Sequence, residues 1–288
     1  MRKSVSLSVS FFVLMFSLIG CRHPRAESSP PAQPMAPPTS AAFAPSAKSS
    51  APATHGQNTG VWISIDGMRF DYLRRIKPPF LTKLAAGGAF TTQETPIVPS
   101  LTFPNHTAQV TGFHVDVSGI PMNAFYDSAN GKTYSFPDDC AVIRATPIWN
   151  TATHQGVRTA VIGWPMSQKQ TGPDKAAYCD DRFDKALTDQ QRLDSVVQIL
   201  NHDHADKPLR LVITYVYNTD TVGHKFGPDS PEMAEAVNHL DGELEQFCLS
   251  VVAWFNATHS PQDDLVFLFT TDHGMETVDM DVNMERLL

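Results

Sequence analysis

The sequence predicts an α/β domain built on a mostly parallel sheet with helices on both faces. Four apolar runs of strand length, each followed by turn or polar residues, alternate with segments of helical periodicity. The runs are nearly continuously apolar, which is typical of parallel strands buried on both faces. With 288 residues, of which 42% are hydrophobic and 18% charged, the chain is long enough for one large domain with its own core.

The order of these elements places polar residues at one edge of the sheet. The expected strands are 60–67 ("GVWISIDG"), 157–164 ("VRTAVIGW"), 209–218 ("LRLVITYVYN") and 264–274 ("DLVFLFTTDHG"). The expected helices are 69–76, 80–86, about 102–112, 147–155 and 230–257. Three of the four strands lead to an aspartate, namely Asp66, Asp220 and Asp272. Because ligands of such sheets bind beyond the carboxyl ends of the strands, we expect these carboxylates to converge there.

The first 58 residues read as a targeting segment and a tether. "MRKSVSLSVSFFVLMFSLIGC" has a basic start, an apolar run and a short small-residue stop, which predicts a signal peptide over residues 1–20. Its end, "LIGC", resembles the lipobox of bacterial lipoproteins, and this resemblance implies lipidation at Cys21; a plain secreted protein is the alternative. Residues 21–58 are rich in Pro, Ala and Ser and predict an unfolded spacer. Residues 59–288 would then form the folded domain, tethered to a membrane of the bacterial cell envelope, in the periplasm or at the outer surface.

Charge and cysteine content narrow the possible partners. Thirty acidic residues against 22 basic ones give a formal charge of −8, which argues against general nucleic-acid binding. Small anionic substrates remain compatible, because metal ions can supply local positive charge. In an oxidising compartment the three cysteines after Cys21 allow one bridge, and we favour Cys140 with Cys179 over pairings with Cys248.

Asp66 and Thr102 are the first two candidate site residues. Asp66 follows a predicted strand and precedes Gly67, so it is either a helix cap or an oxygen ligand for a cation. In "PSLTFPNHTAQVTG", Pro104 fits the first turn of a helix, which places Thr102 at the helix N-terminus. The free N–H groups and dipole there favour negative charge, so the hydroxyl could act as a nucleophile. An ordinary threonine N-cap is the alternative.

Two Asp/His pairs complete the set of candidates. Asp220 and His224 are four residues apart, which places both side chains on one side of a helical turn after a strand. Asp272 and His273 are adjacent and leave another strand. Carboxylate and imidazole ligands suit zinc-like divalent cations. A salt-bridged loop pair would explain either cluster alone, but two such clusters at strand ends predict a metal site.

A series of short segments resembles the motifs of one enzyme family. In chain order the segments are "SIDGMRFDYL", "TFPNHTAQVTG", "GIPMNAFYD", "PIWNTATHQG", "GWP", "DTVGHKFGP" and "TTDHGM". They follow the family's order across residues 60–276, and the chain thereby resembles the type I phosphodiesterase/nucleotide pyrophosphatase family of the alkaline phosphatase superfamily. The resemblance implies an alkaline-phosphatase-like fold and hydrolysis of phosphodiester or pyrophosphate bonds in a small phosphoester such as a nucleotide.

The resemblance also implies a role for each candidate residue. One zinc ion would be held by Asp66, Thr102, Asp272 and His273. The other would be held by Asp220, His224 and a third histidine. Thr102 would form a covalent phospho-threonine intermediate, and Asn123 would help bind a phosphoryl oxygen. Two such divalent metal ions clamp the attacking and leaving oxygens of an in-line displacement, and no organic cofactor is expected.

The sequence departs from the family pattern at its end. No histidine follows His273, and the sequence ends fifteen residues later. The third histidine and the C-terminal part of the sheet are therefore expected to be missing, so that 59–288 would be a C-terminally truncated catalytic domain with impaired activity. His154, His239 and His259 could substitute in principle, although nothing in their sequence surroundings indicates this.

Two other functions stay open. A phosphate monoesterase on the same scaffold would need additional positive groups, and no Arg or Lys stands beside Thr102 in the sequence. A non-catalytic surface lipoprotein is favoured by the missing histidine and disfavoured by the retained Thr102, Asp272 and His273. Asn218 and Thr219 precede Asp220 where nucleotide-cleaving members often have Glu-Pro, which puts a nucleotide preference in question.

Overall fold

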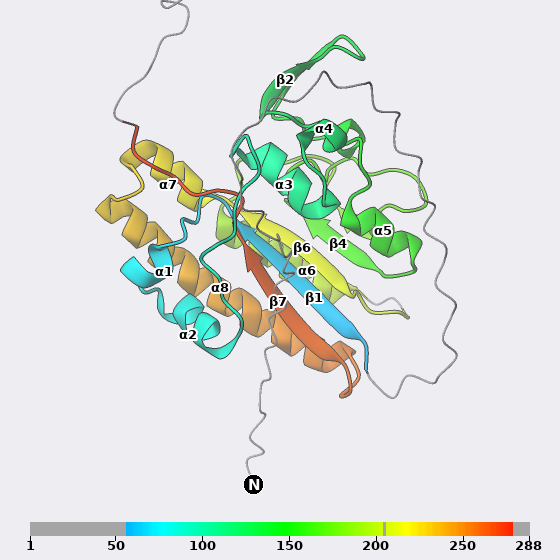
Figure 1. The fold of residues 1–288 in the computed structure, drawn as a ribbon. Helices are drawn as coiled ribbons and strands as arrows, with labels where there is room; N and C mark the ends of the chain where they lie inside the picture. The colour runs from blue at the N-terminus through cyan, green and yellow to red at the C-terminus, as the bar shows by residue number, and fades with distance from the viewer. Residues whose placement is uncertain (1–55, 204–205, 279–288) are drawn as a thin grey trace, which may run out of the picture.

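A five-stranded, entirely parallel sheet forms the centre of the domain (Figure 1). The computed structural model describes residues 56–203 and 206–278. The predicted signal peptide, Cys21 and nearly all of the predicted tether lie outside these ranges. In the order β5-β4-β6-β1-β7, the strands are β5 (Tyr178–Cys179), β4 (Thr159–Ile162), β6 (Leu211–Val216), β1 (Asn58–Ile65) and β7 (Asp264–Thr270). All four predicted strands are confirmed, and β5 was missed because two residues carry no periodic signal.

Eight α-helices accompany the sheet in the described part of the chain. They are α1 (Tyr72–Arg75), α2 (Pro79–Gly87), α3 (Thr102–Thr111), α4 (Val115–Ser118), α5 (Ile148–His154), α6 (Asp189–His202), α7 (Asn218–Phe226) and α8 (Pro231–Thr258). None of them combines the length and apolar character needed to cross a bilayer. A 3-10 turn, η1 (Cys140–Val142), and an antiparallel hairpin of β2 (Ala124–Asp127) and β3 (Lys132–Ser135) lie outside the main sheet.

The sequence contained a signal for α6 that was overlooked. Thr188 accepts a hydrogen bond from the backbone N–H of Gln191, and the Gln191 side chain accepts one from the backbone N–H of Thr188. This reciprocal capping box satisfies two backbone donors at the start of the helix. The spacing of Thr188 and Gln191, read as a helix start, would have predicted α6.

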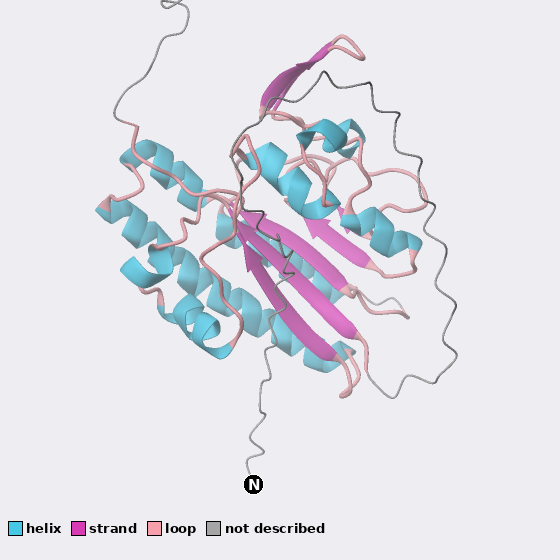
Figure 2. Cartoon of the chain, in the orientation of Figure 1, coloured by secondary structure: helices cyan, strands magenta, loops and turns pink. Residues whose placement is uncertain are grey.

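Side chains of the central strands alternate between two hydrophobic clusters. Val61 and Ile63 of β1 pack with buried residues of α6 and α8 on one face of the sheet. Trp62, between them, packs on the other face with Val110 of α3 and Trp149 of α5. Figure 2 shows these helices on opposite sides of the strands. The predicted sheet with helices on both faces is therefore confirmed.

A buried carboxylate fixes the start of α7, the helix that carries Asp220. Both oxygens of Asp189 accept backbone hydrogen bonds, from Tyr217 N–H and Asn218 N–H, each at 3.0 Å. Negative charge at a helix N-terminus satisfies free N–H groups and complements the dipole. This contact begins α7 two residues after β6 and holds Asp220 close to the carboxyl edge of the sheet.

The long helix α8 offers a test of this core. Leu244 is fully buried against the sheet, whereas Leu249 on the same helix is 57% exposed. We expect Leu244→Ala to lower the free energy of unfolding by about 2–5 kcal/mol, because it removes buried methyl groups and leaves a cavity. Leu249→Ala should change it by less than about 0.5 kcal/mol. Urea unfolding followed by circular dichroism measures both, and equal losses would contradict the assigned packing of α8.

Candidate functional site

Residues from three distant segments meet at the carboxyl edge of the sheet. Asp66 follows β1, and Asp272 and His273 follow β7; one potential ligand atom from each lies within 4.8 Å of the other two. All three residues are buried. The hydroxyl of Thr102, the first residue of α3, is 3.3 Å from His273 Nε2. The parallel order of β1 and β7 produces this meeting, because both strands end at the same edge.

Each carboxylate of this cluster has one oxygen bonded to protein and one without a hydrogen bond. Asp66 Oδ2 accepts from the Tyr215 hydroxyl, and Asp272 Oδ1 accepts from the backbone N–H groups of Gly67, at 3.2 Å, and His273, at 2.9 Å. Asp66 Oδ1 and Asp272 Oδ2 are buried without a hydrogen-bond partner. They lie 3.4 and 3.3 Å from His273 Nε2. Two carboxyl oxygens without a hydrogen bond thus face one imidazole nitrogen.

The backbone sets the orientation of the His273 ring. Nδ1 is 3.0 Å from the Gly274 carbonyl, which can only accept a hydrogen bond. In a neutral ring the proton is therefore on Nδ1, and Nε2 presents its lone pair to Asp66, Asp272 and Thr102. Burying unpaired carboxylate oxygens is costly unless a cation or a proton compensates them. The donor set, two carboxylate oxygens and one imidazole nitrogen, therefore fits a divalent cation.

The acidity of the carboxyl groups reflects their burial and crowding. Burial raises the pKa of Asp66 well above its ordinary value, and the nearby charges of Asp272 and Asp220 raise it further. Burial also raises the pKa of Asp272, to about 7, and that of Asp220. These directions are those expected when carboxylates are taken out of water and placed near one another. A bound cation would favour their ionised forms.

Asp220 and His224 lie beside the cluster as an incomplete second pair. Asp220 Oδ1 is buried without a hydrogen bond and lies 3.4 Å from His224 Nε2, and the His224 side chain is 73% exposed. The backbone of Asp220 packs on Gly67, where φ is +66° and an added Cβ would lie 3.2 Å from Asp220 Cα. The positive φ favours glycine there, and the close approach of the Asp220 backbone leaves little room for a side chain. Within the described residues no third His, Cys, Asp or Glu joins this pair.

The three histidines considered as substitutes lie elsewhere in the described structure. His259 is 3.2 Å from the carbonyl oxygen of Leu209, which precedes β6 and therefore lies at the opposite end of the strand from Asp220. His239 pairs with Glu243, and His154 pairs with Asp174. None of them belongs to the cluster of Asp66, Asp272 and His273.

Asn123 lies at the beginning of α3, beside the Thr102 position. Its Oδ1 accepts a hydrogen bond of 3.0 Å from the backbone N–H of Phe103, the second residue of the helix. This contact fixes the orientation of the side-chain amide, so that its NH₂ group is the donor end. An amide donor next to a helix N-terminus suits an anionic phosphoryl group.

His106 has a place in the site that the sequence reasoning missed. It is fully buried on α3, and its Nδ1 is 2.8 Å from the carbonyl oxygen of Thr102, while its Nε2 is 2.9 Å from Ser64 Oγ. Nδ1 also lies 3.4 Å from Asp272 Oδ2. Burial lowers the pKa of His106 to about 3, so the ring is neutral. The spacing of four between Thr102 and His106 was the available signal.

The predicted disulfide is not formed in the structure. Cys140 and Cys179 are both free and half-buried, and Cys248 is a buried free thiol in the core. Burial raises the pKa of Cys140 and of Cys179, which keeps both side chains in the thiol form. The Cys140–Cys179 bridge expected from the sequence is therefore absent from the structure.

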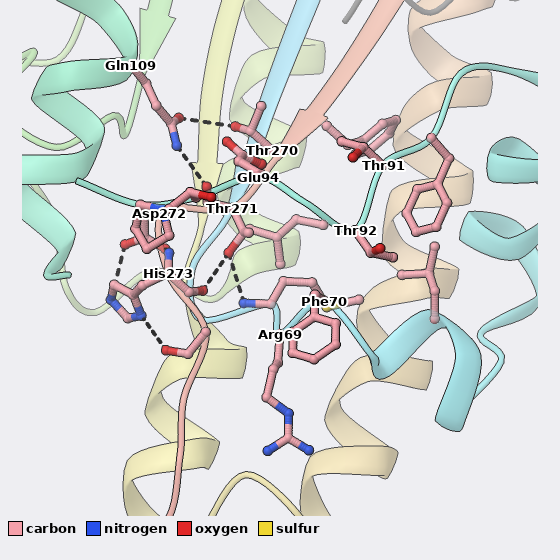
Figure 3. A pocket seen from close by; sticks show the side chains of 18 of the residues that line it. Arg69, Phe70, Thr91, Thr92, Glu94, Gln109, Thr270, Thr271, Asp272 and His273 are labelled. Atoms are coloured by element: carbon pink, nitrogen blue, oxygen red, sulfur yellow. Dashed lines mark hydrogen bonds and ion pairs between the residues drawn. The ribbon is translucent and has the colours of Figure 1, made fainter. Parts of the chain in front are cut away.

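A pocket of about 470 Å³ adjoins the cluster along β7 (Figure 3). Asp272 and His273 line one part of it, and apolar side chains such as Phe70 and Phe90 line another. Gln109 of α3 stabilises the polar side of this pocket. Its side chain accepts a hydrogen bond from Thr270 Oγ1 at 3.2 Å and donates one to the Thr271 carbonyl at 2.8 Å. These bonds join α3 to the end of β7, the two elements that supply Thr102 and Asp272.

Comparison of the sequence with known protein families agrees with the arrangement of these site residues. Residues 61–288 match the family model described as type I phosphodiesterase / nucleotide pyrophosphatase. The chain belongs to this family. The family predicted from the ordered motifs is thus confirmed, as is the fold of the alkaline phosphatase superfamily.

The similar proteins are longer than this sequence. An uncharacterized pyrophosphatase/phosphodiesterase of Schizosaccharomyces pombe is 34% identical over 229 residues, which cover 76% of this chain and 45% of the relative. Human ectonucleotide pyrophosphatase/phosphodiesterase family member 7 is 26% identical over 250 residues, which cover 82% and 52%. The chain therefore spans about half the length of these relatives.

Solved structures of the family share the fold. Mouse ectonucleotide pyrophosphatase/phosphodiesterase 5 superposes with a TM-score of 0.70 at 25% identity, covering 81% of this chain and 61% of the mouse chain. An inactive variant of the mouse protein in complex with AMP gives a TM-score of 0.71 at 23% identity, covering 81% and 62%.

The raised pKa of Asp272 predicts a pH-dependent stability of the cation-free chain. The folded state retains a proton that the unfolded state releases, so this stabilisation is present at low pH and is lost as pH rises from 3.8 to about 7. We expect the free energy of unfolding, measured with chelator present, to fall over this interval and to fall less in Asp272→Asn. The matched control is Asp116→Asn, at an exposed position in α4. Identical slopes for wild type and Asp272→Asn would contradict the prediction.

Proposed function

We propose that the whole protein hydrolyses phosphodiester or pyrophosphate bonds at a site for two divalent cations, which we take to be Zn²⁺. The observation that carries this proposal is the cluster of Asp66, Asp272 and His273 next to the Thr102 hydroxyl, with two buried carboxylate oxygens that lack a hydrogen bond. Family membership supports the reaction class. The AMP complex of the similar mouse protein supports a nucleotide as a candidate substrate.

The ligand sets follow from the two groups of side chains. Asp66, Thr102, Asp272 and His273 would hold one cation. Asp220 and His224 would hold the other, with a further ligand from outside the described residues. When bound, these ions would supply Lewis acidity at the Thr102 hydroxyl and at the leaving oxygen.

Each of the remaining site residues then has its own role in an in-line displacement at phosphorus. Thr102 Oγ1 loses its proton to solvent and attacks phosphorus, the ester or pyrophosphate oxygen leaves, and a phospho-threonine forms that keeps the remaining substituent of the phosphoryl group. Water then hydrolyses this ester and regenerates Thr102. The Asn123 NH₂ group and the N-terminus of α3 donate to the phosphoryl oxygens as charge develops. His106 holds the carbonyl of Thr102 and so keeps the first turn of α3 in place.

The charge around the site favours a diester over a monoester. A phosphate monoester carries one more negative charge and needs additional positive groups. Arg69 lines the adjoining pocket, but its guanidinium is paired with Asp71 at 2.7 Å and with Asp229 at 2.6 Å. A monoesterase is therefore the second candidate.

Replacing the nucleophile tests the mechanism. On the whole protein we expect p-nitrophenol release from a phosphodiester to be faster than from the monoester and to stop with chelator. Thr102→Ala should lower turnover by at least about 1,000-fold, because it removes the attacking oxygen. Thr111→Ala, at the other end of α3, is the matched control. Faster monoester turnover would reject the diesterase assignment, and substantial activity of Thr102→Ala would reject the nucleophile.

We also propose that the chain is lipid-anchored at Cys21 in the cell envelope. The support is the sequence of residues 1–58 alone: a signal-like start, a lipobox-like "LIGC" and a Pro-rich spacer. In a bacterial host, wild type should incorporate labelled fatty acid and sediment with membranes, and Cys21→Ala should do neither. Labelling of Cys21→Ala equal to wild type would contradict the anchor.

A further inference from the structure

The two oxygens of the Asp66 carboxylate have different surroundings. Oδ2 accepts a hydrogen bond from the phenol of Tyr215. Oδ1 is buried, has no hydrogen-bond partner and lies 3.4 Å from His273 Nε2. The phenol therefore occupies the oxygen that faces away from the ligand cluster, and the free oxygen is the one that faces His273.

The sheet itself holds Tyr215 in position. Tyr215 of β6 is in register with Ser64 of β1, two residues before Asp66, so that its ring stands on the α3 face of the sheet. Only 4% of the residue is exposed. The ring packs edge-on against His106, with centroids 4.9 Å apart at 86°, and stacks on Tyr217 at 6.0 Å. A ring confined on several sides has little freedom to move its hydroxyl elsewhere.

A carboxylate held in this way has a defined way to bind a cation. With Oδ2 engaged by a donor, only Oδ1 offers free lone pairs toward the cluster, which favours ligation through one oxygen. Without the phenol, the carboxylate could rotate or present both oxygens. Asp272 is restrained in a similar way, because the N–H groups of Gly67 and His273 occupy its Oδ1 and leave Oδ2 free.

We propose that Tyr215 is a positioning residue for the cation site: its hydroxyl fixes the Asp66 carboxylate so that Oδ1 alone is presented as a ligand. This inference rests on the proposed function, since it assumes that Asp66 binds a cation. Tyr215 acts through its contact with the ligand Asp66. Groups that orient metal ligands typically affect metal affinity by about 10–100-fold.

The test is removal of one hydroxyl without change of shape. Zn²⁺ affinity of the full chain is measured by competition with a chromophoric chelator for wild type, Tyr215→Phe and Tyr217→Phe. We expect Tyr215→Phe to bind Zn²⁺ about 10–100-fold more weakly. Tyr217→Phe is the matched control, because its hydroxyl donates to the backbone carbonyl of Lys185 and not to Asp66. The Co²⁺-substituted proteins should differ in visible absorption spectrum only for Tyr215→Phe.

A second pair of variants separates positioning from a general loss of structure. In the Asp66→Asn background, Tyr215→Phe should have little further effect on affinity, because the group through which it acts is already changed. Equal losses in both backgrounds, or wild-type affinity and Co²⁺ spectrum in Tyr215→Phe, would overturn the proposal. If the wild-type protein does not bind Zn²⁺, both the proposed function and this inference are rejected. If the wild-type protein binds Zn²⁺ tightly and Tyr215→Phe binds it with the same affinity, only this inference is rejected.

Discussion

The burial of several carboxylates at one edge of the sheet is the constraint on which this structure depends. Asp66, Asp220 and Asp272 are brought together largely out of water, where burial raises the pKa of each carboxyl group, and the charges of Asp272 and Asp220 raise that of Asp66 further. A fold tolerates such a cluster only if something compensates the charge. The unsatisfied oxygens Asp66 Oδ1, Asp220 Oδ1 and Asp272 Oδ2 mark the positions at which compensation is needed.

The surrounding protein orients the carboxylates of Asp66 and Asp272 and does not neutralise their charge. Within the part of the chain that the structure describes, no Lys or Arg donates a hydrogen bond to the carboxylates of Asp66 and Asp272; the donors are the Tyr215 phenol and backbone N–H groups. Neutral donors orient an anion while leaving its charge available to a cation. The orientation of His273 by the Gly274 carbonyl has the same character. The site is therefore organised for a positive ion that the polypeptide does not supply.

The parallel sheet explains how a small number of contacts can bring the site residues together. Parallel pairing aligns the ends of β1, β6 and β7, and the helices that follow or approach these ends carry Asp220 and Thr102. Small interactions then set the final positions: Asp189 caps α7, Gly67 admits the backbone of Asp220, and Gln109 joins α3 to the end of β7. The arrangement of side chains at this edge thus depends on groups spread over most of the described chain.

The sequence by itself determined the strands, their parallel character and the residues expected at the edge. Apolar runs and strand-ending aspartates are local patterns, so Asp66, Thr102, Asp220 and the Asp272–His273 pair could be named in advance. The two-residue strand β5 carried no periodic signal, and α6 was missed although its capping residues were present. Only the tertiary structure decided that Tyr215 and His106 stand behind the site and that Cys140 and Cys179 remain unbridged. The reason is physical: which oxygen of a carboxylate is free, and which side chains meet, depends on contacts between segments far apart in the chain, and such contacts leave no trace in local periodicity.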